Sequence, residues 1–114
     1  MATTSTIAPG EALLLTELIV PTPHGIASRI LSKNAGGSIT LFAFDAGQGL
    51  AEHSAPFDAI VMVLDGALTL TIGGALVRAG AGTVVRMPAN VPHAVDAQDP
   101  ARMILTMLRE PKTP

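Results

Sequence analysis

The sequence contains no cysteine, tryptophan or tyrosine, and phenylalanine occurs only three times. Without cysteine the chain cannot form disulfides, cysteine-based zinc sites or a thiol nucleophile. The scarcity of aromatic rings argues against surfaces that stack nucleic-acid bases or sugar rings. Nine acidic and seven basic residues give a net charge of −2, which offers no electrostatic basis for binding nucleic acid or an anionic membrane. We therefore expect neither of these partners.

Long hydrophobic runs are also missing. The run from Leu13 to Val20 is too short to cross a membrane and is interrupted by Glu17. The first ten residues have no basic residue ahead of an apolar run, so they lack the pattern of a secretory signal. Together with the absence of cysteine, which is usual in a reducing compartment, these features predict a cytoplasmic protein.

The 114 residues are enough for one domain, and 48 % of them are hydrophobic. Near the N-terminus, Ala12, Leu15, Leu18 and Ile19 recur with helical spacing, which predicts a short helix within residues 11–20. The prolines of the following PTPHG segment must end that helix, because proline removes a backbone donor and restricts the residue before it.

After Gly25 the pattern changes to that of β-strands. Short apolar or alternating runs are separated by turn signals, and Asp65-Gly66 and Gly73-Gly74 favour two-residue hairpins. Turns recur roughly every eight to twelve residues, a spacing typical of an all-β sandwich or barrel. The expected strands are residues 26–32, 38–44, 50–54, 59–64, 67–72, 75–78, 83–87, 93–96 and 102–108.

Two segments each carry one histidine among turn-forming residues. Residues 47–66 contain His53, and residues 82–97 contain His93. These segments resemble the two motifs of the cupin family, over about residues 25–108 of the chain. The positions that match are Gly47, His53 and Gly66 in the first motif, and Gly82, Pro88 and His93 in the second.

The resemblance implies an all-β, cupin-like jelly-roll β-barrel, commonly a homodimer. We accordingly expect residues 1–24 to form an N-terminal tail with the short helix and residues 25–110 to form the barrel. Cupins that bind iron, manganese, nickel or zinc typically use three histidines and a glutamate. Here Ala55 stands at the position of one histidine, Ala59 at that of the glutamate, and Asn90 at that of a motif glycine.

Only His53 and His93 of the implied ligand set are therefore present. Because a stable transition-metal site needs about three or four protein ligands, the expectation is at most a weakly held divalent ion on these two residues. A third ligand from outside the motifs is an open alternative. Asp58 and Glu52 each neighbour an inward position, so alternation points them the other way, whereas His24 could reach over the barrel mouth from its loop.

Strand alternation also predicts the surroundings of the two histidines. Positions 59, 61 and 63 share one face and positions 93 and 95 share another, so we expect the two imidazoles to face each other inside the barrel. The expected ligand pocket consists of His53, His93, Val61, Val63, Val95 and Phe57. In the competing interpretation each histidine is a hydrogen-bonded residue of the β core and the two do not meet. Arg86 is expected to face outward, with anchoring of an anionic ligand as the alternative.

Three functions remain open from the sequence. The first is a small cupin-fold protein that binds a small molecule in an apolar pocket carrying two histidines. The second is a metal-dependent cupin enzyme, of dioxygenase or isomerase type, that uses His53 and His93 with a third ligand from outside the family's set. The third is an interaction module with a vestigial pocket. No ligand, cofactor or catalytic residue can be named from the sequence.

Overall fold

Within residues 6–109, which the computed structural model describes, the chain forms nine β-strands and one short 3-10 helix. The first five residues of the expected N-terminal segment and the last residue of the expected barrel domain lie outside that range. The elements are η1 (Leu15–Glu17), β1 (Ile26–Asn34), β2 (Gly37–Phe44), β3 (Gly49–His53), β4 (Asp58–Asp65), β5 (Ala67–Ile72), β6 (Ala75–Gly80), β7 (Val84–Met87), β8 (His93–Asp96) and β9 (Ala101–Leu108).

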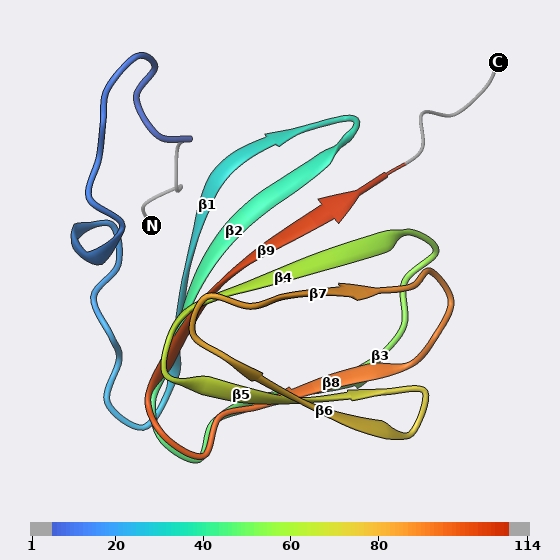
Figure 1. Ribbon diagram of the computed structural model, residues 1–114. Coiled ribbons are helices and arrows are strands. Elements are labelled where there is room, and N and C mark those ends of the chain that lie inside the picture. Colours follow the sequence, from blue (N-terminus) through green and yellow to red (C-terminus); the bar gives the residue numbers. More distant parts are fainter. Residues whose placement is uncertain (1–5, 110–114) are drawn as a thin grey trace, which may run out of the picture.

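The strands form two antiparallel sheets that face each other (Figure 1). The larger sheet has the order β1-β2-β9-β4-β7, and the smaller has the order β3-β8-β5-β6. Strands β2 to β9 thus follow the order of an eight-stranded jelly roll, with β1 added at one edge. The predicted all-β jelly-roll barrel is confirmed. In Figure 1 the β3–β4 and β7–β8 connections lie together at one end of the barrel, which we call the mouth.

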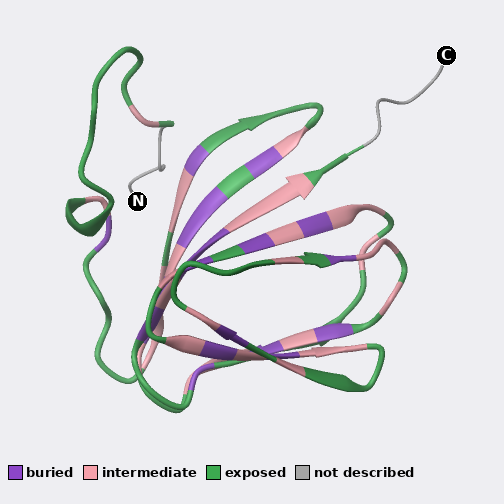
Figure 2. Ribbon diagram, in the orientation of Figure 1, coloured by how far each residue is buried: buried purple, intermediate pink, exposed green. Residues whose placement is uncertain are grey.

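The main core fills the space between the sheets, and alternation along each strand supplies it (Figure 2). On β4, for example, Val61 and Val63 are buried whereas Met62 between them is exposed. Complete burial of a side chain of this size stabilises the fold by roughly 1.5–3 kcal/mol. The buried members of the core are Phe44, Ala59, Val61, Val63, Leu68, Leu70, Ala79, Met87, Val95, Ala97, Ala101 and Met103.

A second, smaller cluster lies on the opposite face of the larger sheet, where the N-terminal segment covers it. Ile19 is buried there, with Ile7 and Leu18 packed alongside. The backbone N–H of Ile7 donates to the carbonyl of Leu31 (3.0 Å), and the Arg29 guanidinium donates to the carbonyl of Leu18 (3.1 Å). The segment is therefore held against β1 mainly as an irregular, extended chain.

The short N-terminal helix predicted from the sequence is present, but it is a single turn and covers only part of residues 11–20. Its N-cap residue, Leu14, makes no side-chain capping bond, and no residue of the turn is buried. Leu15, expected on the buried helical face, is 38 % exposed. Packing of Ile19 and hydrogen bonding to β1 prevail over the local helical preference. No helix among the described residues is long and apolar enough to cross a membrane.

Candidate functional site: two histidines at the barrel mouth

His53 reaches the mouth through an irregularity in β3. Leu50 pairs with Val95 and His53 pairs with His93, so three steps along β3 match two steps along β8. This extra residue is a β-bulge, which bends a strand and redirects the side chains that follow it. With regular alternation, Leu50 and His53 would point to opposite faces of the sheet. The bulge instead places His53 on the face that Leu50 and Val95 share.

His93 occupies the first position of β8, between two neighbouring strands. It pairs with His53 of β3 on one side and with Ile72 of β5 on the other. Its side chain lies on the same face as that of Val95, which belongs to the core. His93 is only 5 % exposed, whereas His53 is exposed. The pair therefore extends from the interior of the barrel, where His93 lies, to its surface, where His53 lies.

The two imidazole rings are in direct contact. Their Nε2 atoms are 3.2 Å apart, and their ring centroids are 4.4 Å apart with the planes inclined at 70°. The Nδ1 atom of His53 lies 2.9 Å from the carbonyl oxygen of Ala51, and the Nδ1 atom of His93 lies 3.2 Å from that of Val91. Each ring is thus oriented by the carbonyl two residues before it, and the remaining nitrogens converge on one point.

Burial lowers the pKa of His93 below its usual value, because the charged imidazolium loses its hydration between the sheets. The hydrogen bond to Val91 opposes this effect, and the nearby His53 reinforces it. The neutral form of His93 is therefore favoured in the folded protein. A neutral imidazole carries one N–H and one lone pair, so the position of that hydrogen decides what the site can bind.

Among the other residues expected in the pocket, the three valines lie in the main core. Val61, Val63 and Val95 are at most 2 % exposed, so they pack against neighbouring side chains with almost no accessible surface. Phe57 lies just before β4, and the guanidinium carbon of Arg109 is 5.1 Å from the centre of its ring. That these four residues contact a ligand stays a prediction.

The residues considered as a third ligand are held elsewhere or point away. The carboxylate of Asp58 accepts hydrogen bonds from the backbone N–H of Ala89 (2.9 Å) and from Arg86 (3.1 Å). The backbone N–H of His24 donates to Asp45, beside the Gly47–Ala97 hydrogen bond at the opposite end of β8 from His93. Glu52 is exposed. The alternative that Arg86 anchors an anion is weakened, because its guanidinium pairs with Asp58.

The donor set does not match the four-ligand metal site that the family motifs imply. No group of three or more histidine, cysteine, aspartate or glutamate side chains within residues 6–109 is arranged to hold a metal ion. Ala55 and Ala59 offer only methyl groups at the two remaining positions. Two imidazoles bring no negative charge to offset that of a divalent cation, so they do not account for a tightly bound metal.

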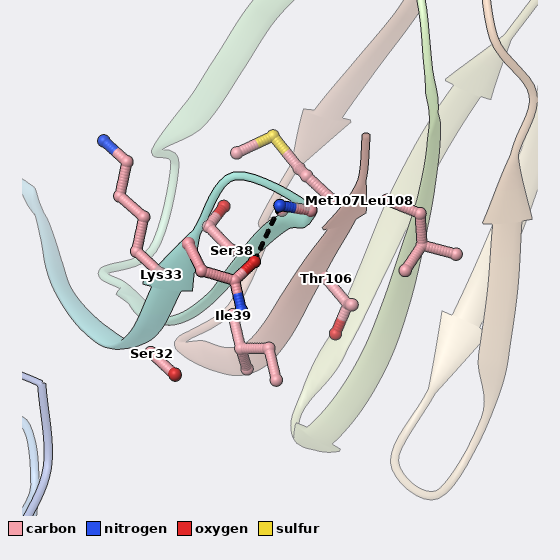
Figure 3. A pocket seen from close by; sticks show the side chains of 10 residues that line it. Ser32, Lys33, Ser38, Ile39, Thr106, Met107 and Leu108 are labelled. Carbon is pink, nitrogen blue, oxygen red and sulfur yellow. Dashed lines mark hydrogen bonds between the residues drawn. The ribbon is translucent and has the colours of Figure 1, made fainter. Parts of the chain in front are cut away.

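Two surface cavities lie away from the histidine pair. A cavity of about 180 Å³ lies beside the β1–β2 hairpin and the end of β9 (Figure 3). Ser38 contributes to its lining, and the buried hydroxyl of Ser38 has no hydrogen-bond partner among the described residues. A second cavity of about 230 Å³ lies near Pro21 and Pro100. Neither is lined by His53 or His93.

Comparison with solved structures identifies the fold. A conserved protein of unknown function from Streptococcus pyogenes is 31 % identical, with a TM-score of 0.88 and 98 % of each chain covered. A cupin superfamily protein from Desulfitobacterium hafniense is 22 % identical, with a TM-score of 0.85, covering 96 % of this chain and all of the other. A cupin 2 conserved barrel domain protein from Leptotrichia buccalis is 30 % identical with a TM-score of 0.79. In that comparison 82 % of this chain is covered, but only 46 % of the larger protein.

No curated protein is similar enough to this chain to give a match. The family model described as "Cupin domain", in contrast, matches residues 40–107, which include both histidines and eight of the nine strands entirely or for the most part. This match covers more than half of the sequence and agrees with the jelly-roll order of the strands. The chain therefore belongs to the cupin family.

Proposed function

We propose that this cupin binds a small molecule at the barrel mouth, where His53 and His93 meet. The observation that supports this proposal is the convergence of the two Nε2 atoms, 3.2 Å apart, on strands whose residues Leu50 and Val95 belong to or pack against the apolar main core. Ligand sites typically combine an apolar lining with a few polar groups that point to one place. The exposed ring of His53 gives a ligand access from solvent, and the buried ring of His93 gives it a fixed partner.

A thermal-unfolding screen with NMR follow-up tests this proposal. Because a ligand that binds only the folded state raises stability, metal-free protein is screened against defined panels of alcohols, amines, sugars and carboxylic acids. We expect at least one compound class to raise the unfolding temperature of the natural protein and to lose that effect in His53→Ala. His24→Asn is the matched control, since His24 has a positive φ of 58° that asparagine tolerates. Equal stabilisation of His53→Ala and the natural protein would place the ligand elsewhere.

A metal-dependent cupin enzyme is the second candidate. The spacing of the Nε2 atoms supports it, because two nitrogens each about 2.0–2.1 Å from a tetrahedral zinc ion are separated by about 3.3 Å. The lack of further ligands argues against it, so small-molecule binding without a resident metal is the stronger proposal. Metal analysis of protein purified without chelators separates the two: a near-stoichiometric transition metal would favour the enzyme.

We also propose that the protein is a homodimer. Apolar side chains remain exposed on the outer face of the larger sheet, where Met62 (40 % exposed) pairs with Val84 (63 % exposed) next to the cluster covered by the N-terminal segment. A second copy would remove them from water. Val84→Glu should then give a monomer mass in light scattering. Leu76→Glu, at an exposed leucine of the smaller sheet, should leave the dimer mass unchanged. A monomeric natural protein at micromolar concentration would exclude the dimer.

A cytoplasmic location stays a prediction from the sequence.

A further inference from the structure

We infer that the histidine pair presents only hydrogen-bond acceptors, so that it selects ligands carrying hydroxyl or ammonium donors over carboxylate anions. This inference rests on the proposed binding of a small molecule at the mouth and specifies the chemical class of that molecule.

The hydrogen on each ring is located by its carbonyl partner. A carbonyl oxygen can only accept a hydrogen bond, so the Nδ1 atom that faces it must carry the hydrogen. This holds for His53, whose Nδ1 faces the Ala51 carbonyl at 2.9 Å, and for His93, whose Nδ1 faces the Val91 carbonyl at 3.2 Å. In a neutral ring the other nitrogen then has a lone pair and no hydrogen. When both rings are neutral, both Nε2 atoms are therefore acceptors.

These two acceptors face each other at 3.2 Å, which is a hydrogen-bond distance with no hydrogen to fill it. The His93 ring is nearly buried, and leaving a buried polar atom without a partner costs free energy. An ammonium group placed beside both nitrogens can donate one hydrogen to each of them, and a hydroxyl group can donate its single hydrogen to one of them. A carboxylate at the same place would add more lone pairs to a point where two already converge.

The backbone of the loop that precedes His93 has no N–H group left to donate to an anion either. Residues 88 and 92 are prolines and have no backbone N–H. The N–H groups of the three residues between them are already donated: Ala89 to the Asp58 carboxylate, Asn90 to the Ala55 carbonyl (2.7 Å), and Val91 to the Pro88 carbonyl (3.4 Å). Arg86, the cation closest in sequence to this loop, is paired with Asp58.

The alanines at positions 55 and 59 also leave the acceptors without a partner from the protein. Neither side chain can donate a hydrogen bond, and Ala59 is only 5 % exposed within the main core. We infer that the ligand supplies the donor. We therefore assign the site to uncharged or cationic molecules such as alcohols, polyols and amines.

Heteronuclear NMR on histidine-labelled, metal-free natural protein at about pH 8 tests the inference in two steps. Two-bond ¹H–¹⁵N correlations first report the tautomer of each ring, and both rings should carry the hydrogen on Nδ1. Matched probes are then titrated: propane-1,2-diol against lactate, and propane-1,3-diamine against malonate. We expect the donor probe of each pair to shift both Nε2 signals with an apparent Kd at least about tenfold lower than that of its carboxylate partner.

The possible results distinguish a failure of this inference from a failure of the proposed function. An Nε2–H tautomer in either ring, or carboxylates that shift the Nε2 signals as strongly as the donors, would overturn the inference while leaving a small-molecule site in place. If no compound shifted either ring, this inference and the proposed function would both fail. In His53→Ala, which removes an exposed side chain and one acceptor, the diol should bind His93 more weakly. His24→Asn should match the natural protein.

Discussion

The strands β3 and β8 deliver one histidine each to the same point, but they do so differently. In both rings Nδ1 lies within hydrogen-bond distance of the carbonyl oxygen two residues earlier. His93 lies in a strand paired on both sides and is buried, whereas His53 ends a strand with a β-bulge and is exposed. The same local contact therefore orients both rings. Because His93 is buried and His53 is exposed, we expect the stability of the fold to depend on His93 more than on His53.

The largest expected effect comes from giving both histidines the ligands that the family motifs contain. In Ala55→His combined with Ala59→Glu, three imidazoles and a carboxylate would surround one point if the barrel still holds these positions as the family does. The carboxylate would also offset the charge of the ion. We expect zinc or nickel to bind more than roughly a hundredfold tighter than to the natural protein, a difference of about 2.7 kcal/mol, as measured by calorimetric titration after chelator treatment.

Two controls make the metal prediction specific. Adding His93→Gln to the double variant should remove most of the gained affinity, since a ligand from the buried side of the site is lost. The larger side chains can overpack the mouth at a cost of about 1–3 kcal/mol, so the fold of each variant is checked by circular dichroism. Equally tight binding by the natural protein would show that a residue outside the motifs already completes the site.

The next expected effect is an asymmetry in stability between the two histidines. His93→Ala should lower the free energy of unfolding by about 1–3 kcal/mol, because it removes a buried, hydrogen-bonded side chain. His53→Ala should stay within about 0.5 kcal/mol of the natural protein, as is usual for an exposed residue. Urea unfolding measures both. Equal losses would contradict the division between a buried and an exposed ring.

A third prediction uses pH to separate the rings. Because the pKa of His93 is lower in the folded protein than in the unfolded chain, the unfolded chain binds more protons below about pH 6.5. Stability should therefore fall as the pH drops from about 6.5 through the folded-state pKa of His93. In His93→Gln this part of the decline should be absent. Urea midpoints measured between pH 7.5 and 5 provide the test, with His24→Asn as a control that should retain the decline.

Much of this architecture was predictable from the sequence, because alternation and turn residues act locally. The turns at Asp65-Gly66 and Gly73-Gly74 bound strands with the expected limits, such as β5 at Ala67–Ile72. Gly73-Gly74 forms the predicted hairpin between β5 and β6, whereas the hairpin predicted at Asp65-Gly66 is wrong, because this turn leads from β4 of the larger sheet to β5 of the smaller one. The N-terminal helix is shorter than predicted, since its contacts with β1 involve residues distant in sequence. Helical spacing alone could not reveal that competition.

The site was predictable in part, through the motif spacing around His53 and His93. The bulge between Leu50 and His53 was not, because an extra residue in β3 is recognised only against the register of β8. The carbonyls of Ala51 and Val91 were also missed. They belong to residues whose side chains suggest no chemistry, and sequence patterns do not report where a backbone carbonyl points.

The smallest expected effect comes from the contact that supports only one of the two histidines. The Asp58 carboxylate accepts from the N–H of Ala89, in the loop leading to His93, and no comparable bond links Asp58 to His53 among the described residues. The Ala89 bond, followed by Arg86, lowers the pKa of Asp58, so its contribution to stability is present above about pH 3.8 and is lost as the pH falls through the folded-state pKa. Asp58→Asn should flatten the acid limb of the stability profile. It should also shift the ¹⁵N signals of His93 more than those of His53, and an equal shift in both rings would mean that the loop positions the pair as one unit.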